Sequence, residues 1–95
     1  MICVGTIVKL ITPCLENPAG TLGVCYEEYD IGDGHGVSII FKNGNYDGFS
    51  PRDQSMFLEV VGYALDLSDY KFTNVMRLSK DYKEGKFNNI WICGK

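Results

Sequence analysis

The sequence predicts a mainly β fold with short helices, an α+β domain in which a small antiparallel barrel has helices covering one end. Two observations support this prediction. Four segments with strand-like alternation of apolar and polar side chains fill the first half of the chain, and helix signals appear only after residue 49. The connections between the strands are too short for parallel pairing, which needs crossovers of about a dozen residues or more. We therefore expect one antiparallel domain over residues 1–95.

Four strands are expected, each rich in β-branched or aromatic residues. They cover residues 2–11, 21–29, 37–41 and 45–49. The proline-containing segment 12–20 and the glycine-rich segment 30–36 are expected to be loops. Asn43-Gly44 predicts a two-residue type I′ turn between the last two of these strands.

A first helix is predicted to begin after Ser50, because a hydroxyl cap there precedes Pro51 at the first helical position. We expect this helix to end at Gly62 and to cover an open end of the sheet. Its apolar face would contain Met56, Phe57, Val60 and Val61.

The remaining chain predicts a strand, a helix and a strand. Residues 69–72 are expected to form the strand, and Thr73 or Asn74 to cap a second helix that ends at Gly85. Residues 87–93 alternate in polarity and predict a closing strand or an ordered tail. The apolar face of the second helix would carry Val75, Leu78 and Tyr82.

Composition and charge are typical of a globular protein. Hydrophobic residues make up 45% of the chain and charged residues 22%, so burial can offset the entropy of ordering the backbone. The formal charge is −3, and the basic residues are scattered singly along the chain. This pattern disfavours nucleic-acid binding, which needs clustered cations, and is too weakly acidic to predict imitation of DNA.

The chain has no apolar run of the roughly 18 residues that span a bilayer, and its first residues do not have the pattern of a secretory leader. We therefore expect a cytoplasmic protein that does not bind membranes. In that compartment the four cysteines are expected to be reduced core thiols rather than disulfides. They are Cys3, Cys14, Cys25 and Cys93.

Two stretches of the chain carry a resemblance to a known family. Residues 17–29 read NPAGTLGVCYEEY, and residues 36–44 read GVSIIFKNG. A glycine-containing turn, a Gly-x-x-Gly-Val strand and an apolar hairpin that ends in glycine resemble the small SH3-like barrels of the KOW type. The resemblance implies an SH3-like barrel, and many such barrels bind RNA, ribosomes or peptides.

The sequence predicts no catalytic residue, no metal site and no cofactor. His35 is the single imidazole and lies in a glycine-rich loop that is poorly suited to holding a catalytic geometry. Asp30, Asp33 and His35 lack the acidic spacing of a calcium loop, and no close pair of cysteines provides a zinc site. We therefore expect that the protein is not an enzyme.

Twelve aromatic residues are more than a small core easily hides, and exposed tyrosines make good interface anchors. We expect a protein-interaction or regulatory module that binds a protein partner or its own copy, such as a phage or mobile-element accessory or inhibitor protein. The alternative, that the rings cover the ends of the barrel, stays open at this point. The predicted partner-binding residues are Tyr26, Glu27, Glu28, Tyr29, Tyr46, Asp47 and Phe49.

A second reading of the sequence is a barrel associated with nucleic acid or with the ribosome. It depends on a local basic face near the second predicted helix, within residues 71–86. The side chains of this face would be Lys71, Arg77, Lys80, Lys83 and Lys86.

Overall fold

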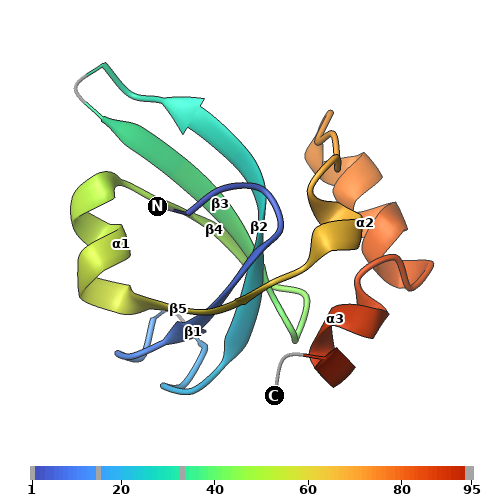
Figure 1. Cartoon of the computed structure of the whole chain (residues 1–95), viewed down its shortest axis with the longest axis horizontal. Helices are drawn as coiled ribbons and strands as arrows, with labels where there is room; N and C mark the ends of the chain where they lie inside the picture. Colours follow the sequence, from blue (N-terminus) through green and yellow to red (C-terminus); the bar gives the residue numbers. More distant parts are fainter. Residues whose placement is uncertain (1, 15, 33, 94–95) are drawn as a thin grey trace.

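A five-stranded antiparallel sheet forms the N-terminal part of the protein, and short helices follow it. The computed structural model describes residues 2–14, 16–32 and 34–93. The strands are β1 (Thr6–Leu10), β2 (Leu22–Asp30), β3 (His35–Phe41), β4 (Tyr46–Phe49) and β5 (Leu58–Tyr63). The helices are α1 (Pro51–Phe57), the 3₁₀ helix η1 (Leu65–Leu67), α2 (Val75–Lys83) and α3 (Asn88–Cys93). The predicted α+β class and antiparallel pairing are confirmed (Figure 1).

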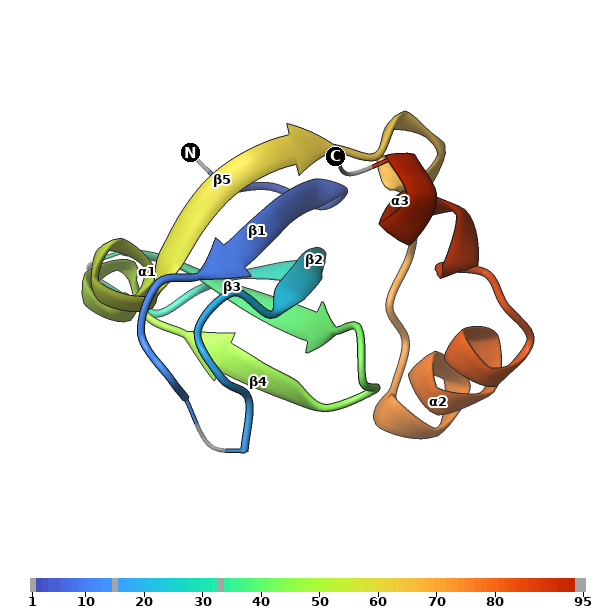
Figure 2. The same cartoon turned by 90° about the horizontal axis from the view of Figure 1, so that it is seen from below.

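The sheet is curved but open. Its strands lie in the order β4-β3-β2-β1-β5, so β4 and β5 form its two edges (Figure 2). Within the described residues no ladder joins β4 to β5, and the expected closure into a barrel is therefore not observed. The physical reason is local: β4 ends at Phe49, and the chain turns into α1 before β5 begins.

Side chains from both faces of the sheet are buried, because neighbouring residues of a strand point to opposite faces. Val8 of β1 belongs to a first core on the concave face, whereas Ile7 belongs to a second core on the convex face. The first core contains Ile2, Val8, Leu10, Cys25, Val37, Ile39, Phe41, Phe49 and Leu58. The second core contains Ile7, Val24, Tyr26, Ile40, Ala64, Leu67, Leu78, Phe87 and Ile90.

The turn between β3 and β4 is one residue longer than predicted. The N–H of Gly44 donates to the carbonyl of Phe41 at 2.8 Å, and the N–H of Phe41 donates to the carbonyl of Asn45 at 2.7 Å. The loop is therefore residues 42–44, with Gly44 at a φ of 93°. This is the arrangement of a turn followed by a left-handed residue, for which glycine has no steric cost, and the two-residue type I′ turn is wrong.

The first helix begins where the sequence predicts and ends earlier. Ser50 accepts the N–H of Asp53 at 3.2 Å through its hydroxyl, but helix α1 ends at Phe57 and Leu58 is already extended. The next residues form β5 and pair with β1: Val60 lies opposite Val8, and Val61 is the extra residue at a bulge. Pairing with this distant strand, together with β-branched side chains, has overridden the helical pattern.

The C-terminal segments differ from the prediction at two places. The expected strand at 69–72 is not formed, and Phe72 packs instead on the ring of Tyr26 with centroids 4.9 Å apart. The expected closing strand is the helix α3, which buries Ile90 and packs Trp91 against the second core. Helix α2 is confirmed, with Asn74 accepting the N–H of Arg77 at 2.9 Å.

Cys3, Cys14 and Cys25 are free cysteines, but the predicted core position holds only for Cys25, because Cys3 and Cys14 are half-buried. Cys25 is buried in the first core, where burial raises the pKa of its thiol to about 12. The prediction for the side chain of Cys93 lies outside the described residues. Among the helices that the structure describes, none combines the length and the apolar character needed to cross a membrane.

Candidate functional site

The register of the sheet separates the seven predicted partner-binding residues into two groups. Glu27 pairs with Ser38, Tyr29 with Gly36 and Tyr46 with Ile40, and these positions share the convex face with Ile40. A bulge between Cys25 and Glu27 places Tyr26 on that face as well. The other three residues alternate to the concave face. They are Glu28, Asp47 and Phe49.

Two of the predicted anchors are core residues. Tyr26 is 4% exposed and Phe49 is 2% exposed. Tyr26 packs on Phe72, and Phe49 packs at 6.2 Å between centroids on both Phe41 and Phe57. Burial raises the pKa of the Tyr26 hydroxyl to about 12. These two rings therefore fill the interior of the fold, one in each core, and do not cover the ends of a barrel.

Tyr29 lies across the convex face on two glycines of neighbouring strands. A Cβ added to Gly36, its partner on β3, would collide with the Tyr29 ring, and a Cβ on Gly48 of β4 would lie 2.9 Å from its hydroxyl oxygen. Gly36 is therefore needed for the ring to lie on the sheet, whereas a side chain at position 48 would displace only the Tyr29 hydroxyl. The result is a half-buried tyrosine in a fixed orientation, and its burial raises the pKa of its hydroxyl.

Tyr46 stands at the rim of a groove between the β3–β4 hairpin and α2. The Tyr46 side chain is 46% exposed, and the groove has a volume of about 300 Å³. The hydroxyl of Tyr82 donates to the carbonyl of Lys42, which fixes α2 against the hairpin. The groove is lined by Ile40, Asn43, Gly44, Asn45, Tyr46, Leu78, Ser79, Tyr82 and Lys83.

The carboxylates of the predicted acidic rim are held by the protein itself. Glu27 accepts the hydroxyl of Ser38 at 3.0 Å. Glu28 accepts the N–H of Val4 at 2.9 Å, and its carboxylate lies 3.2 Å from the Nε2 atom of His35. Asp47 accepts a backbone N–H from its neighbour at 2.8 Å. The three carboxylates do not form one continuous acidic edge.

No group of three or more His, Cys, Asp and Glu side chains is placed to hold a metal ion in the described part of the chain. The spacing of Asp30, Asp33 and His35 did not predict a metal site, and Asp33 lies outside the described residues. His35 is instead held at the start of β3 beside Glu28.

The predicted basic face is divided between two surfaces. Lys71, Arg77 and Lys86 line a polar cleft of about 500 Å³, which also contains Asp69, Tyr70, Thr73 and Asp81. Lys83 borders the groove beside Tyr46, and Lys80 lines neither space. The five side chains therefore do not act as one face.

A buried carboxylate lies in the polar cleft. Asp81 is 8% exposed, accepts the hydroxyl of Tyr70 at 2.8 Å and has its Oδ1 atom 3.5 Å from the Nε atom of Arg77. Burial and the negative charge of Asp81 raise the pKa of Tyr70. The ammonium group of Lys86 lies 5.3 Å from the centre of the Tyr70 ring. Part of the positive charge of the cleft is therefore neutralised internally.

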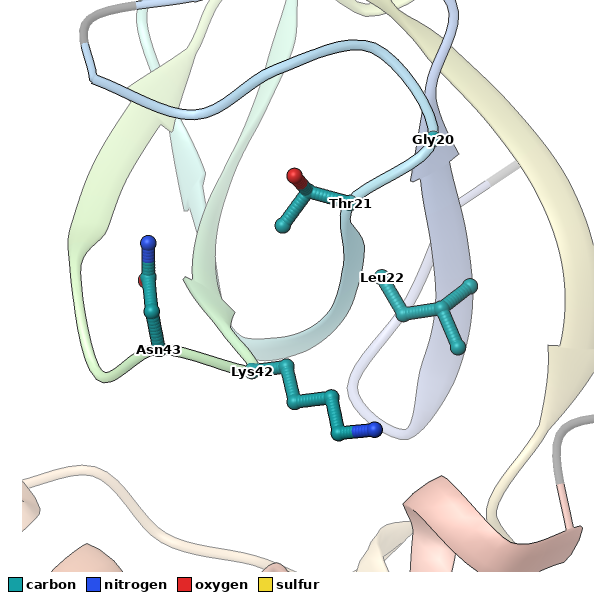
Figure 3. Close-up of a pocket in the computed structure, with 5 residues that line it drawn as sticks. All are labelled: Gly20, Thr21, Leu22, Lys42 and Asn43. Atoms are coloured by element: carbon teal, nitrogen blue, oxygen red, sulfur yellow. The ribbon is translucent and has the colours of Figure 1, made fainter.

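A third hollow of about 390 Å³ lies between the start of β2 and the β3–β4 hairpin. Figure 3 shows Thr21 and Asn43 projecting into this space, with Lys42 beside Leu22. The hydroxyl of Thr21 donates to the carbonyl of Pro18 at 2.7 Å, so its hydrogen is already used within the loop. The one charged side chain that lines this hollow is the exposed Lys42.

Comparison with protein families, with characterised proteins and with solved structures finds no match to this chain. The function is therefore argued from the geometry of its surfaces. Tyr29 and Tyr46 were predicted as partner-binding residues from the excess of aromatic residues alone. The contribution of α2 to the groove was not predicted, because Leu78 and Tyr82 are more than thirty residues from the hairpin that they face.

Proposed function

We propose that this chain is a small non-enzymatic module that binds a protein partner in the cytoplasm. The proposed binding surface is the convex aromatic face, defined as Glu27, Tyr29 and Tyr46 together with the α2 side of the groove. One observation carries the proposal: the exposed ring of Tyr46 stands at the rim of a groove whose walls are fixed by the Tyr82 hydrogen bond to the hairpin. A rigid groove beside an exposed tyrosine binds with little loss of entropy.

The partner that fits this surface is an extended peptide segment with one apolar side chain. Ile40 and Leu78 lie at the floor of the groove and are 1% and 0% exposed, so its accessible apolar surface comes mainly from the Tyr46 ring. One cation, Lys83, lies at its rim. An apolar side chain would fill the groove, and a carboxylate one or two residues away would pair with Lys83. Glu27 on the same convex face would set the direction of the peptide by repelling that carboxylate.

The assignment of the fold to the SH3-like barrels is part of this proposal. β1 is paired on both of its edges, with β2 and with β5. The sheet curls around the first core (Figure 2). That curvature supports the assignment, but fold analogy carries little weight for function. The function depends on the convex aromatic face.

A peptide library displayed on phage tests the proposal. The wild-type protein should enrich peptides with an apolar residue near a carboxylate, and Tyr46→Ala should weaken a selected peptide by about tenfold or more, as removal of a central aromatic anchor does. Tyr46→Phe should retain most of the binding, because the ring supplies the contact. Ile31→Ala, at an exposed position in another loop, is the matched control. Failure to enrich any peptide, or binding that survives Tyr46→Ala, would refute the proposal.

A nucleic-acid-binding module is the second candidate, and one observation favours it. Lys71, Arg77 and Lys86 line a single cleft with room for a phosphate group. Single-stranded RNA should then bind with an affinity that falls steeply with salt, and Lys86→Glu should abolish the binding. Lys42→Glu, at an exposed lysine outside this cleft, is the control. Asp69 and Asp81 in the same cleft weigh against this candidate.

A further inference from the structure

The outer edge of β5 is an open strand edge. β5 pairs with β1 through residues from Leu58 to Tyr63, and no described segment pairs with its other side. An unpaired edge presents backbone N–H and C=O groups that can extend the sheet. Figure 2 shows β5 at one end of the curved sheet, away from α2.

Exposed apolar side chains are concentrated at this edge. Ten large hydrophobic side chains are exposed in the described part of the chain, and six of them belong to β5 or its immediate neighbours. Ile11 joins the set because its N–H donates to the carbonyl of Phe57 at 2.9 Å, directly before β5. Scattered apolar residues need no explanation, but a contiguous set does. The β5 edge patch consists of Ile11, Met56, Val60, Val61, Tyr63 and Leu65, which are 39–78% exposed.

The charge on β5 permits a second copy of the same strand. Its single charged residue, Glu59, lies 3.6 Å from the ammonium group of Lys9 on β1. In an antiparallel pair of two β5 strands with the two-fold axis at Val61, Glu59 falls opposite Tyr63 of the other copy. The two Glu59 side chains are then about 14 Å apart along the strand, at about 3.4 Å per residue, so like charges do not meet.

We propose that the β5 edge is a homodimer interface, in which two copies pair β5 with β5 and join their sheets. An antiparallel strand pair of this kind uses the same patch on both subunits, as two-fold symmetry requires. The six side chains, each about half exposed, leave on the order of 500 Å² per copy. Coverage of all six in both copies would bury about 1,000 Å², which is the lower limit for a specific interface.

The structure also gives a reason why assembly through strand pairing would stop at a dimer. Pairing of two β5 strands leaves the β4 strands as the remaining edges, and β4 has only four residues, with Asp47 and Gly48 at its centre. Short edges with a charge and a glycine pair poorly with further strands. The bulge opposite Ile7 and Val8 bends β5, which limits the register to a short stretch.

Light scattering during gel filtration tests the dimer. The wild-type protein should have twice the 10.6 kDa mass of one chain, and Val61→Lys and Leu65→Lys should each shift the mass to that of a monomer, with at least a tenfold rise in the dissociation constant. Met76→Lys, at an 81% exposed residue of α2, is the matched control and should remain dimeric. Circular dichroism of each variant establishes that the fold is retained.

Hydrogen exchange gives a second readout that does not need a variant. Amides of β5 should be more protected at high than at low protein concentration, whereas those of β4 should not change. A monomeric wild-type protein, or a dimer that persists in both Val61→Lys and Leu65→Lys, would overturn the proposal. A dimer broken by Tyr46→Ala instead would also overturn it, because that result places the interface on the convex aromatic face.

Discussion

The two faces of the sheet are both buried, but by different parts of the chain. The concave core is filled by side chains of the strands themselves, with Phe57 of α1 packed against it. The convex core is covered by segments that follow β5, through Leu67, Leu78 and Phe87. Strand pairing fixes the geometry of the first core, whereas side-chain packing positions the helices over the second (Figure 1). The same side-chain truncation should therefore lower the free energy of unfolding more in the concave core than in the convex core.

Truncation of one large side chain in each core gives the largest expected effect. Leu10→Ala should lower the free energy of unfolding by about 3–5 kcal/mol, and Leu78→Ala by about 2–3 kcal/mol, because α2 can move toward the cavity while β1 cannot. Both residues are fully buried. Urea denaturation of the two variants measures the difference. Equal losses would mean that the helices are as tightly fixed as the strands.

An added methyl group tests the packing density of the concave core. A Cβ on Gly23 would lie 2.6 Å from Ile39 Cγ2 and 2.8 Å from Phe41 Cδ1. Gly23→Ala should therefore destabilise the protein by about 1–3 kcal/mol. Gly62→Ala is the matched control, since its Cβ would meet Ile7 at an ordinary 3.6 Å. Thermal unfolding of both proteins decides the point, and a stable Gly23→Ala would show that the concave core has free space.

Alkaline pH should destabilise both cores, because each contains a buried group that ionises at high pH. The two groups are the thiol of Cys25 in the concave core and the hydroxyl of Tyr26 in the convex core. Burial raises the pKa of Cys25 from 9.0 to about 12 and that of Tyr26 from 10.0 to about 12. Both folded pKa values lie above the unfolded ones, so the neutral forms favour the folded state. This stability is complete below the unfolded pKa and is lost as pH rises toward 12.

Each titrating group should cost at most about 1.4 kcal/mol per pH unit in that range. Cys25→Ala should flatten the loss that begins near pH 9, and Tyr26→Phe the loss that begins near pH 10. Urea midpoints measured at several pH values give both slopes. Unchanged slopes in both variants would contradict the burial of the two groups.

The smallest expected effect concerns the polar contact at the edge of the convex core. Tyr70→Phe removes the hydrogen bond to the carboxylate of Asp81 and should cost about 1 kcal/mol. Tyr46→Phe, at a ring that is 46% exposed and outside the β5 edge patch, should be nearly neutral. Chemical denaturation of the two variants provides the comparison. A loss that is equal in both would mean that solvent replaces the Tyr70 hydroxyl without cost.

The sequence predicted the elements that depend on local signals. Alternation located the first four strands, and the Ser50 and Asn74 caps located the starts of two helices. It failed at Val60 and Val61, whose apolar run fits both a helix face and a strand, since the choice depends on β1. The prediction of a strand at α3 was wrong for a similar reason. The buried residues Phe87 and Ile90 are three positions apart, as in a helix, but the short alternation of polarity in this segment also fits a strand.

Part of the candidate site was also beyond the reach of the sequence. Tyr26 and Tyr46 look alike in sequence, but Phe72 covers the first ring and leaves the second exposed. Which tyrosine is covered depends on where a distant loop packs. Composition shows that the chain has more aromatic residues than a small core holds. Which of these rings face solvent depends on where the C-terminal segments pack.

The place of β1 in the sheet has a consequence for synthesis on the ribosome. One neighbour, β2, begins at Leu22, whereas the other, β5, ends at Tyr63. The strand pairs up to β4 form between residues that are close in sequence. The other edge of β1 can pair only after a connection of roughly 50 residues has left the ribosome, and contacts between such distant residues form slowly. Until then one edge of β1 is unpaired in the nascent chain, and in this period the chain most needs protection by a chaperone.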